Sequence, residues 1–287
     1  MNEVLGLWNA GEDRFHSRLS AVEVKRIIKA AYRKGITTFD SAYSYLDADT
    51  LLRSALAEMN AEREDWKIIE KIMPVPTLEK KADTILRRLG TDYVDVLLIH
   101  WPAEDESLNK ALKTLETLKA KGKAEAIGVS NFPLELLERI RKDYDITYHE
   151  RPLSLVWNRD YEEEKKLGLK TLAYAPFGFG ILGGTERKEK LEVLPFTKTP
   201  AIDKLRKTLG ETAERHNTTP AAISYTWEES QQPYAVIRGV SSPEQLDIPS
   251  VTLTDDEKRE LTSLADEITS QTESDNIFGH DWKGGKR

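Results

Sequence analysis

Ionisable side chains of several types stand at or just after the ends of short apolar runs in this chain. Asp40 ends the run ITTFD, Lys71 ends WKIIEK and His100 ends VDVLLIH, while Tyr45 lies in the loop that follows Asp40. One polar residue at the end of a buried strand is ordinary. A carboxyl, an ammonium, an imidazole and a phenol at neighbouring strand ends indicate a catalytic site.

These four side chains have the chemistry to deliver a proton to a carbonyl oxygen. With a pKa of about 10, tyrosine is a poor acid near neutral pH until a nearby cation stabilises its phenolate. Lys71 would be that cation, and Asp40 would hold it charged and in place. His100 would donate a hydrogen bond to the oxygen on which negative charge develops. The pattern predicts reduction of an aldehyde or ketone, with Tyr45 as proton donor.

Eight candidate strands alternate with helical segments along the chain. The strands are expected at residues 3–8, 36–40, 66–71, 94–100, 124–130, 153–158, 169–175 and 234–240. This rhythm over about 250 residues is typical of a closed barrel of eight parallel strands, the TIM barrel. The polar segment 159–166 leaves room for only a short sixth helix. We expect one α/β domain over residues 1–287 with a polar tail from about 272, and an open doubly wound sheet is the alternative.

Helix starts are marked by capping residues. Ser20 with Glu23 and Thr254 with Glu257 have the spacing of a capping box. Proline at a first helical position follows a cap residue twice more, at Thr219 and at Ser242.

A glycine motif follows the seventh candidate strand. Gly178, Gly180 and Gly183 have G-x-G-x-x-G spacing, but they lie past the middle of the chain and not in a first strand-to-helix turn. In a TIM barrel the loops after strands seven and eight form the phosphate site. The motif therefore indicates a loop that approaches phosphates, and a flexible turn over the barrel rim is the alternative.

Composition narrows the classes of partner. The formal net charge is -7 and there is no cysteine, so nucleic acid, disulfides and thiolate metal sites are not expected. The first residues lack a signal peptide pattern, and no apolar run is long enough to span a membrane. No H-x-x-x-H pair suggests a metal. We expect a cytoplasmic protein that acts on a small molecule, as a monomer or small homo-oligomer.

Five segments resemble the aldo-keto reductase superfamily in order and spacing. They are GITTFDSAYSY, LLIHWP, IGVSNF, LAYAPFGFGILGG and RGVSSPEQL, between about residues 20 and 246. The resemblance implies a TIM barrel that binds extended NADP(H) and reduces aldehydes or ketones without a metal. It assigns Tyr45 as general acid, with Lys71, Asp40 and His100 as its partners.

The resemblance also implies a set of cofactor contacts. Ser130, Asn131 and Ser154 would hold the nicotinamide carboxamide, Ser154 standing where many members have Gln, and Tyr174 would stack on the nicotinamide ring. The pyrophosphate and adenosine would contact two loops, with the residues Phe177, Gly178, Gly180, Gly183, Arg238, Gly239, Ser241, Ser242 and Gln245. Gln245 replaces the arginine that commonly binds the 2'-phosphate, and Arg238 is a candidate substitute. The expected cofactor is NADP(H), with NAD(H) as the alternative.

Aromatic residues indicate where a substrate would lie. Trp8 and Trp101 would line the mouth beside Tyr45 and suit a carbonyl compound with a flat or hydrophobic body. The composition of the tail, with Phe278, His280 and Trp282, favours disorder over folding across the site. The alternative to an enzyme is a non-enzymatic relative that binds the cofactor as a redox sensor or regulatory subunit.

Overall fold

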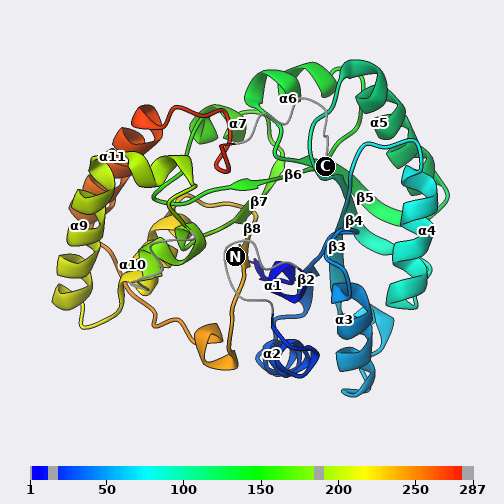
Figure 1. Cartoon of the computed structure of the whole chain (residues 1–287), viewed down its shortest axis with the longest axis horizontal. Helices are drawn as coiled ribbons and strands as arrows, with labels where there is room; N and C mark the ends of the chain where they lie inside the picture. Colours follow the sequence, from blue (N-terminus) through cyan, green and yellow to red (C-terminus); the bar gives the residue numbers. More distant parts are fainter. Residues whose placement is uncertain (1, 12–18, 184–190, 280–287) are drawn as a thin grey trace.

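Eight parallel strands close into a barrel in the computed structural model, which describes residues 2–11, 19–183 and 191–279. Each strand pairs with the next, and the last pairs with the first (Figure 1). The strands are β1 (Asn2–Gly6), β2 (Thr38–Asp40), β3 (Lys67–Ile72), β4 (Val94–Ile99), β5 (Ala124–Ser130), β6 (Tyr148–Pro152), β7 (Lys170–Tyr174) and β8 (Ala235–Arg238). The predicted TIM barrel is confirmed, and the open doubly wound sheet is excluded.

Most of the helices form the outer layer of the barrel (Figure 1). They are α2 (Ala21–Arg33), α3 (Ala48–Ala57), α4 (Leu78–Leu89), α5 (Asp105–Ala120), α6 (Leu134–Ile140), α7 (Tyr161–Lys165), α9 (Ala201–Arg215), α10 (Pro220–Ser230) and α11 (Asp255–Gln271). The short α1 (Trp8–Gly11) lies instead near the centre of the view in Figure 1. Short 3-10 turns are η1 (Arg63–Asp65), η2 (Gly178–Gly183), η3 (Pro195–Lys198) and η4 (Pro243–Leu246). The helix after β6 is short, as predicted, and α9 packs against both α10 and α11.

Local signals in the sequence account for several helix ends. Ser20 and Thr254 form complete capping boxes at α2 and α11, and the Thr219 side chain accepts from an amide in the first turn of α10. Gly90 ends α4 in the left-handed region, at φ 70°. Ser242 lies at the N-cap of η4 with Pro243 at the first position, as predicted, although its side chain makes no capping hydrogen bond to this single turn.

Apolar side chains fill the barrel below the carboxyl ends of its strands. The inner cluster comes from β1, β3, β4, β7 and β8, and consists of Val4, Ile69, Val96, Leu98, Leu172, Ala235 and Ile237. Larger clusters lie between the strands and the helices. The barrel interior is therefore packed, and the side chains that can reach a ligand are those at the upper strand ends.

The sixth strand differs from the prediction. Residues 153–158, expected as a strand, form a buried loop closed by a bridge between Ser154 and Trp157, and β6 is the polar segment YHERP before it. The apolar run led to the wrong strand position because β6 is polar in sequence, and its polar side chains are buried only with the help of partners elsewhere in the fold. His149 Nδ1 lies 2.6 Å from Glu164 of α7, which also pairs with Arg151. Buried polar groups are tolerated in a strand when each is paired.

The tail also differs from the prediction. Phe278 packs against Trp101, with ring centroids 5.7 Å apart, so this part of the chain folds across the barrel mouth and disorder is the wrong expectation for it. The two other aromatic residues of the tail, His280 and Trp282, lie outside the described residues.

Candidate active site

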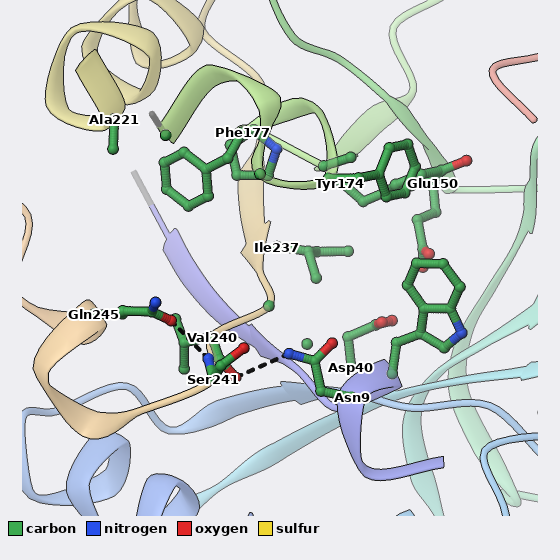
Figure 2. Close-up of a pocket in the computed structure, with 18 of the residues that line it drawn as sticks. Asn9, Asp40, Glu150, Tyr174, Phe177, Ala221, Ile237, Val240, Ser241 and Gln245 are labelled. Atoms are coloured by element: carbon green, nitrogen blue, oxygen red, sulfur yellow. Dashed lines mark hydrogen bonds between the residues drawn. The ribbon is translucent and has the colours of Figure 1, made fainter. Parts of the chain in front are cut away.

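A cavity of about 710 Å³ opens at the carboxyl ends of the strands. Its walls include Asp40 from β2, Glu150 from β6, Tyr174 from β7 and Ile237 from β8. Figure 2 shows Ile237 between two ends of this cavity, with Asp40 and Glu150 towards one and Gln245 at the other. The strand ends thus converge on one pocket, as the barrel rule requires.

Lys71 lies at the centre of a buried charged cluster beside this pocket. Its side chain is 1% exposed, and its ammonium group pairs with Asp40 Oδ2 and lies 3.1 Å from Glu150 Oε1. The Tyr45 ring centroid is 5.5 Å from Lys71 Nζ. Burial lowers the pKa of Lys71, but the charges of Asp40 and Glu150 outweigh it and raise this pKa above its ordinary value. Lys71 is therefore a cation throughout the physiological range.

The two carboxyl groups around Lys71 respond to burial in the same direction. Burial raises the pKa of Asp40, and the charge of Lys71 only partly opposes that rise. Burial and the charge of Asp40 raise the pKa of Glu150 well above its ordinary value. The cluster thus holds two carboxyl groups for one ammonium group.

His100 is a neutral imidazole beside Tyr45. The two rings meet edge to face with centroids 6.0 Å apart. Burial, together with the charge of Lys71, lowers the pKa of His100 to about 3. A neutral imidazole still has one N–H group, so His100 retains the donor that the predicted role requires.

Two of the residues expected to contact a carboxamide lie at the end of β5 and directly after it, and of these Asn131 lines the pocket and Ser130 does not. Asn131 Nδ2 donates to the His100 main-chain oxygen and to Ser130 Oγ, each at 3.0 Å, and Tyr174 Oη donates to Asn131 Oδ1 at 2.6 Å. Ser130 is fully buried behind this amide. The geometry therefore makes Ser130 a support for Asn131.

The position assigned to Ser154 is wrong for a pocket contact. Ser154 is fully buried beyond the end of β6, and it is absent from the pocket wall. Glu150 takes the place of a wall residue on this strand. Counting from the apolar run placed the predicted contact in the loop after β6, whereas the pocket residue comes from the polar strand YHERP itself.

The loop after β7 contributes Phe177, Gly180 and Gly183 to the pocket wall. Gly178 faces the protein: a Cβ there would meet the Val156 side chain at 2.9 Å, and its φ is +52°. The glycine motif therefore builds a tight turn, η2, of which two glycines face the cavity and one packs against the wall behind it.

The loop after β8 forms the far end of the pocket through Gly239, Ser241 and Gln245. Gln245 Oε1 accepts from the Ser241 amide at 2.7 Å, and Asn9 Nδ2 donates to the Val240 main-chain oxygen at 3.0 Å (Figure 2). The second of these contacts attaches the loop to α1. Ser242 lies outside the wall.

Arg238, the candidate substitute for a phosphate ligand, is not part of the pocket wall. Its guanidinium group is buried away from the pocket, where it pairs with Glu3 and donates to the Leu246 main-chain oxygen. Burial lowers the pKa of Arg238 to about 10. Successive strand residues point to opposite faces, so Arg238 points outward because Ile237 points into the barrel.

Four aromatic side chains line the mouth of the pocket. Trp8 lies 6.0 Å from Phe179 and 6.3 Å from Phe278, and Trp101 lies 5.7 Å from Phe278, measured between ring centroids. The sequence predicted Trp8 and Trp101 at this place but neither Phe179 nor Phe278 as a wall residue. Together they give the entrance an apolar, aromatic surface.

A closed (β/α)8 barrel with an ionisable cluster at its upper strand ends has the design of a barrel enzyme. The model of the aldo/keto reductase family matches residues 4–265, and the chain belongs to that family. It is therefore an oxidoreductase of carbonyl compounds, in a family that uses nicotinamide cofactors. The resemblance stated from the sequence segments is confirmed.

Individual relatives agree with this assignment. An aldo-keto reductase of Mycolicibacterium smegmatis is 30% identical over 264 residues, which cover 86% of this chain and 84% of the relative. Glyoxal reductase of Bacillus subtilis is 29% identical over 217 residues, covering 72% and 69%. The structure of a glycerol dehydrogenase from Gluconobacter oxydans has a TM-score of 0.77 at 22% identity, covering 93% and 92%, and shows the same fold.

Among the helices of the described ranges, none combines the length and the apolar character needed to cross a membrane. Within residues 2–11, 19–183 and 191–279, no group of three or more His, Cys, Asp or Glu side chains is arranged to hold a metal ion.

Proposed function

We propose that this chain reduces an aldehyde or ketone with NADP(H), taking the proton from Tyr45. The observation that carries the proposal is the meeting of Tyr45, Lys71, Asp40 and His100 beside one pocket. A bound nicotinamide dinucleotide would supply a hydride to the carbonyl carbon.

Each residue of the cluster has its own part in general acid catalysis. Tyr45 gives its proton to the oxygen as negative charge develops there, and the ammonium of Lys71 stabilises the phenolate left behind. The neutral His100 donates a hydrogen bond to the same oxygen and so holds that oxygen close to the Tyr45 hydroxyl. Asp40 holds the ammonium group in place.

The pocket has the residues that such a cofactor needs. Asn131 and Tyr174 would face the nicotinamide, and the glycines of the loops after β7 and β8 allow the chain to approach phosphates closely. At Gly183 a Cβ would meet none of the described residues within 4 Å. The remaining contacts of the adenosine end would come from Ser241 and Gln245.

Cofactor preference should be weak. Of the described pocket residues, none is Lys or Arg, and Asp247 adds a carboxyl group near Gln245. A 2'-phosphate would gain no ion pair from these residues. Titrating the protein with NADPH and NADH, while following the tryptophan fluorescence to which Trp8 and Trp101 of the pocket contribute, should give Kd values within about tenfold of each other, or about 1.4 kcal/mol.

A matched variant sharpens this titration. Gln245→Arg should favour NADPH and leave NADH binding nearly unchanged, because the added cation meets only the 2'-phosphate. A wild-type preference for NADPH of a hundredfold or more would contradict the expectation.

The aromatic mouth suggests a substrate with a flat or hydrophobic body. Phe278→Ala should raise KM for an aromatic aldehyde by about two- to tenfold, since an aromatic pair contributes about 0.5–1.5 kcal/mol. KM for a short aliphatic aldehyde should change less. Steady-state kinetics with the two substrates checks this, and equal changes in KM would mean that Phe278 acts only on the shape of the site.

The proposed function is tested by mixing the purified protein with NADPH and an aromatic aldehyde. Loss of the absorbance of the reduced nicotinamide at a rate proportional to protein concentration would support the enzyme. Tight cofactor binding with no turnover of any aldehyde or ketone would favour the alternative, a cofactor-binding sensor or regulatory subunit.

A further inference from the structure

We propose that Glu150 is a positioning residue that shares Lys71 with Asp40 and so sets the pH up to which Tyr45 remains a proton donor. The inference rests on the proposed function, since it concerns the acid of the same reaction.

Glu150 is placed to act on Lys71 with both of its carboxyl oxygens. Oε1 lies 3.1 Å and Oε2 3.3 Å from Lys71 Nζ, and the residue is 3% exposed. Asp40 contacts the same ammonium group through Oδ2. The ammonium group that should stabilise the Tyr45 phenolate is therefore shared with two carboxyl groups.

The surroundings of this cluster contain few other charges. The titratable groups that act on Glu150 or Lys71 come from β2, β3, β7 and the loops after β2 and β4, and they are Asp40, Glu70, Lys71, His100, Tyr174 and Tyr45. His100 is neutral, and burial raises the pKa of Tyr174 and that of Glu70 well above their ordinary values. Among these groups, Asp40 and Glu150 are the carboxyl groups that contact the ammonium group of Lys71 next to Tyr45.

Glu150 gives this cluster a charge that changes with pH. The charges of Asp40 and Lys71 cancel. Protonated Glu150 leaves the cluster neutral, and ionised Glu150 gives it one negative charge. Because burial raises the pKa of Glu150, Glu150 loses its proton at a higher pH than an exposed glutamate does. The carboxylate that then forms offsets part of the positive charge of Lys71 and so disfavours the Tyr45 phenolate.

The consequence is that carbonyl reduction continues to a higher pH. The Lys71 charge lies beside the Tyr45 ring, and a carboxylate that offsets part of this charge shifts the pKa of the phenol upward. Tyr45 therefore keeps its proton, and stays a donor, to a higher pH than Asp40 and Lys71 alone would allow.

The test is the pH dependence of kcat/KM for reduction of an aromatic aldehyde by NADPH. In Glu150→Gln the decline on the basic side should come about one unit or more lower than in the wild type, with little change on the acid side. Oxidation of the matching alcohol, which needs the phenolate, should begin at a correspondingly lower pH. Glu125→Gln, which removes an exposed carboxylate from β5, should leave both profiles unchanged.

A conservative variant separates charge from shape. Glu150→Asp keeps a carboxyl group and should return the basic limit towards that of the wild type, and Glu150→Ser replaces Glu150→Gln should the latter not fold. Coincident profiles for an active wild type and an active Glu150→Gln overturn the inference alone. Absence of reduction by the wild type overturns the proposed function and, with it, this role.

Discussion

Replacing Tyr45 with phenylalanine should lower kcat for carbonyl reduction by about 100- to 10,000-fold, the usual contribution of a positioned general acid. The phenyl ring keeps the edge-to-face contact with His100 and the place beside Lys71, so only the proton is removed. Cofactor affinity should stay nearly constant, because the interaction lost is made in the transition state. Steady-state kinetics measures kcat, and a fluorescence titration with NADPH measures the cofactor Kd separately.

A second tyrosine in the same loop provides the control. Tyr43 lies under the side chains of Lys81 and Arg88, with cation-to-centroid distances of 4.1 and 4.9 Å, and is not part of the pocket wall. Tyr43→Phe should therefore leave kcat unchanged. Equal rates for Tyr45→Phe and the wild type would remove Tyr45 from the role of proton donor.

The sequence predicted the barrel and most of the ionisable cluster because both depend on short-range patterns. Asp40 ends β2, Lys71 is the last residue but one of β3, and His100 directly follows β4, so each lies at or near the end of a largely apolar run. Such strands are recognisable without knowledge of their neighbours. The barrel then brings their ends together, as the contacts of Lys71 show.

Glu150 could not be recognised in the same way. Its strand contains His149 and Arg151, and all three polar side chains are satisfied by residues far away in the sequence, such as Glu164 and Lys71. Hydropathy alone therefore assigns the strand to the apolar loop that follows. Phe278 is a comparable case, since its position over the mouth depends on docking of the chain after α11 and not on a local pattern.

Replacing Lys71 with methionine should affect both catalysis and the free energy of unfolding. Without the cation, the Tyr45 phenolate loses its stabilisation, and kcat should fall by about 100-fold or more. Asp40 and Glu150 would keep their burial but lose their ionic partner, and breaking a buried pair commonly costs about 3–5 kcal/mol. Carboxyl groups reduce such a cost by taking up protons, so the loss of stability should depend on pH.

The sign of this dependence follows from the direction of the two pKa shifts. Burial already raises the pKa of Asp40 and of Glu150 in the wild type, and removal of Lys71 raises both further. A group whose pKa is higher in the folded state contributes stability below its unfolded pKa, and loses it as pH rises through the folded value. Lys71→Met should therefore approach the wild type in acid and become progressively less stable as the pH rises.

Urea unfolding at about pH 5 and about pH 8 measures this difference, because the carboxyl groups of an unfolded chain titrate near pH 4. Lys170→Met is the matched control, since Lys170 lies at the start of β7, over the rings of Tyr148 and Tyr234, and away from both carboxyl groups. Its free energy of unfolding should differ from that of the wild type by a similar amount at both pH values. The same pH-independent difference for Lys71→Met would mean that Asp40 and Glu150 do not depend on Lys71 for their charge.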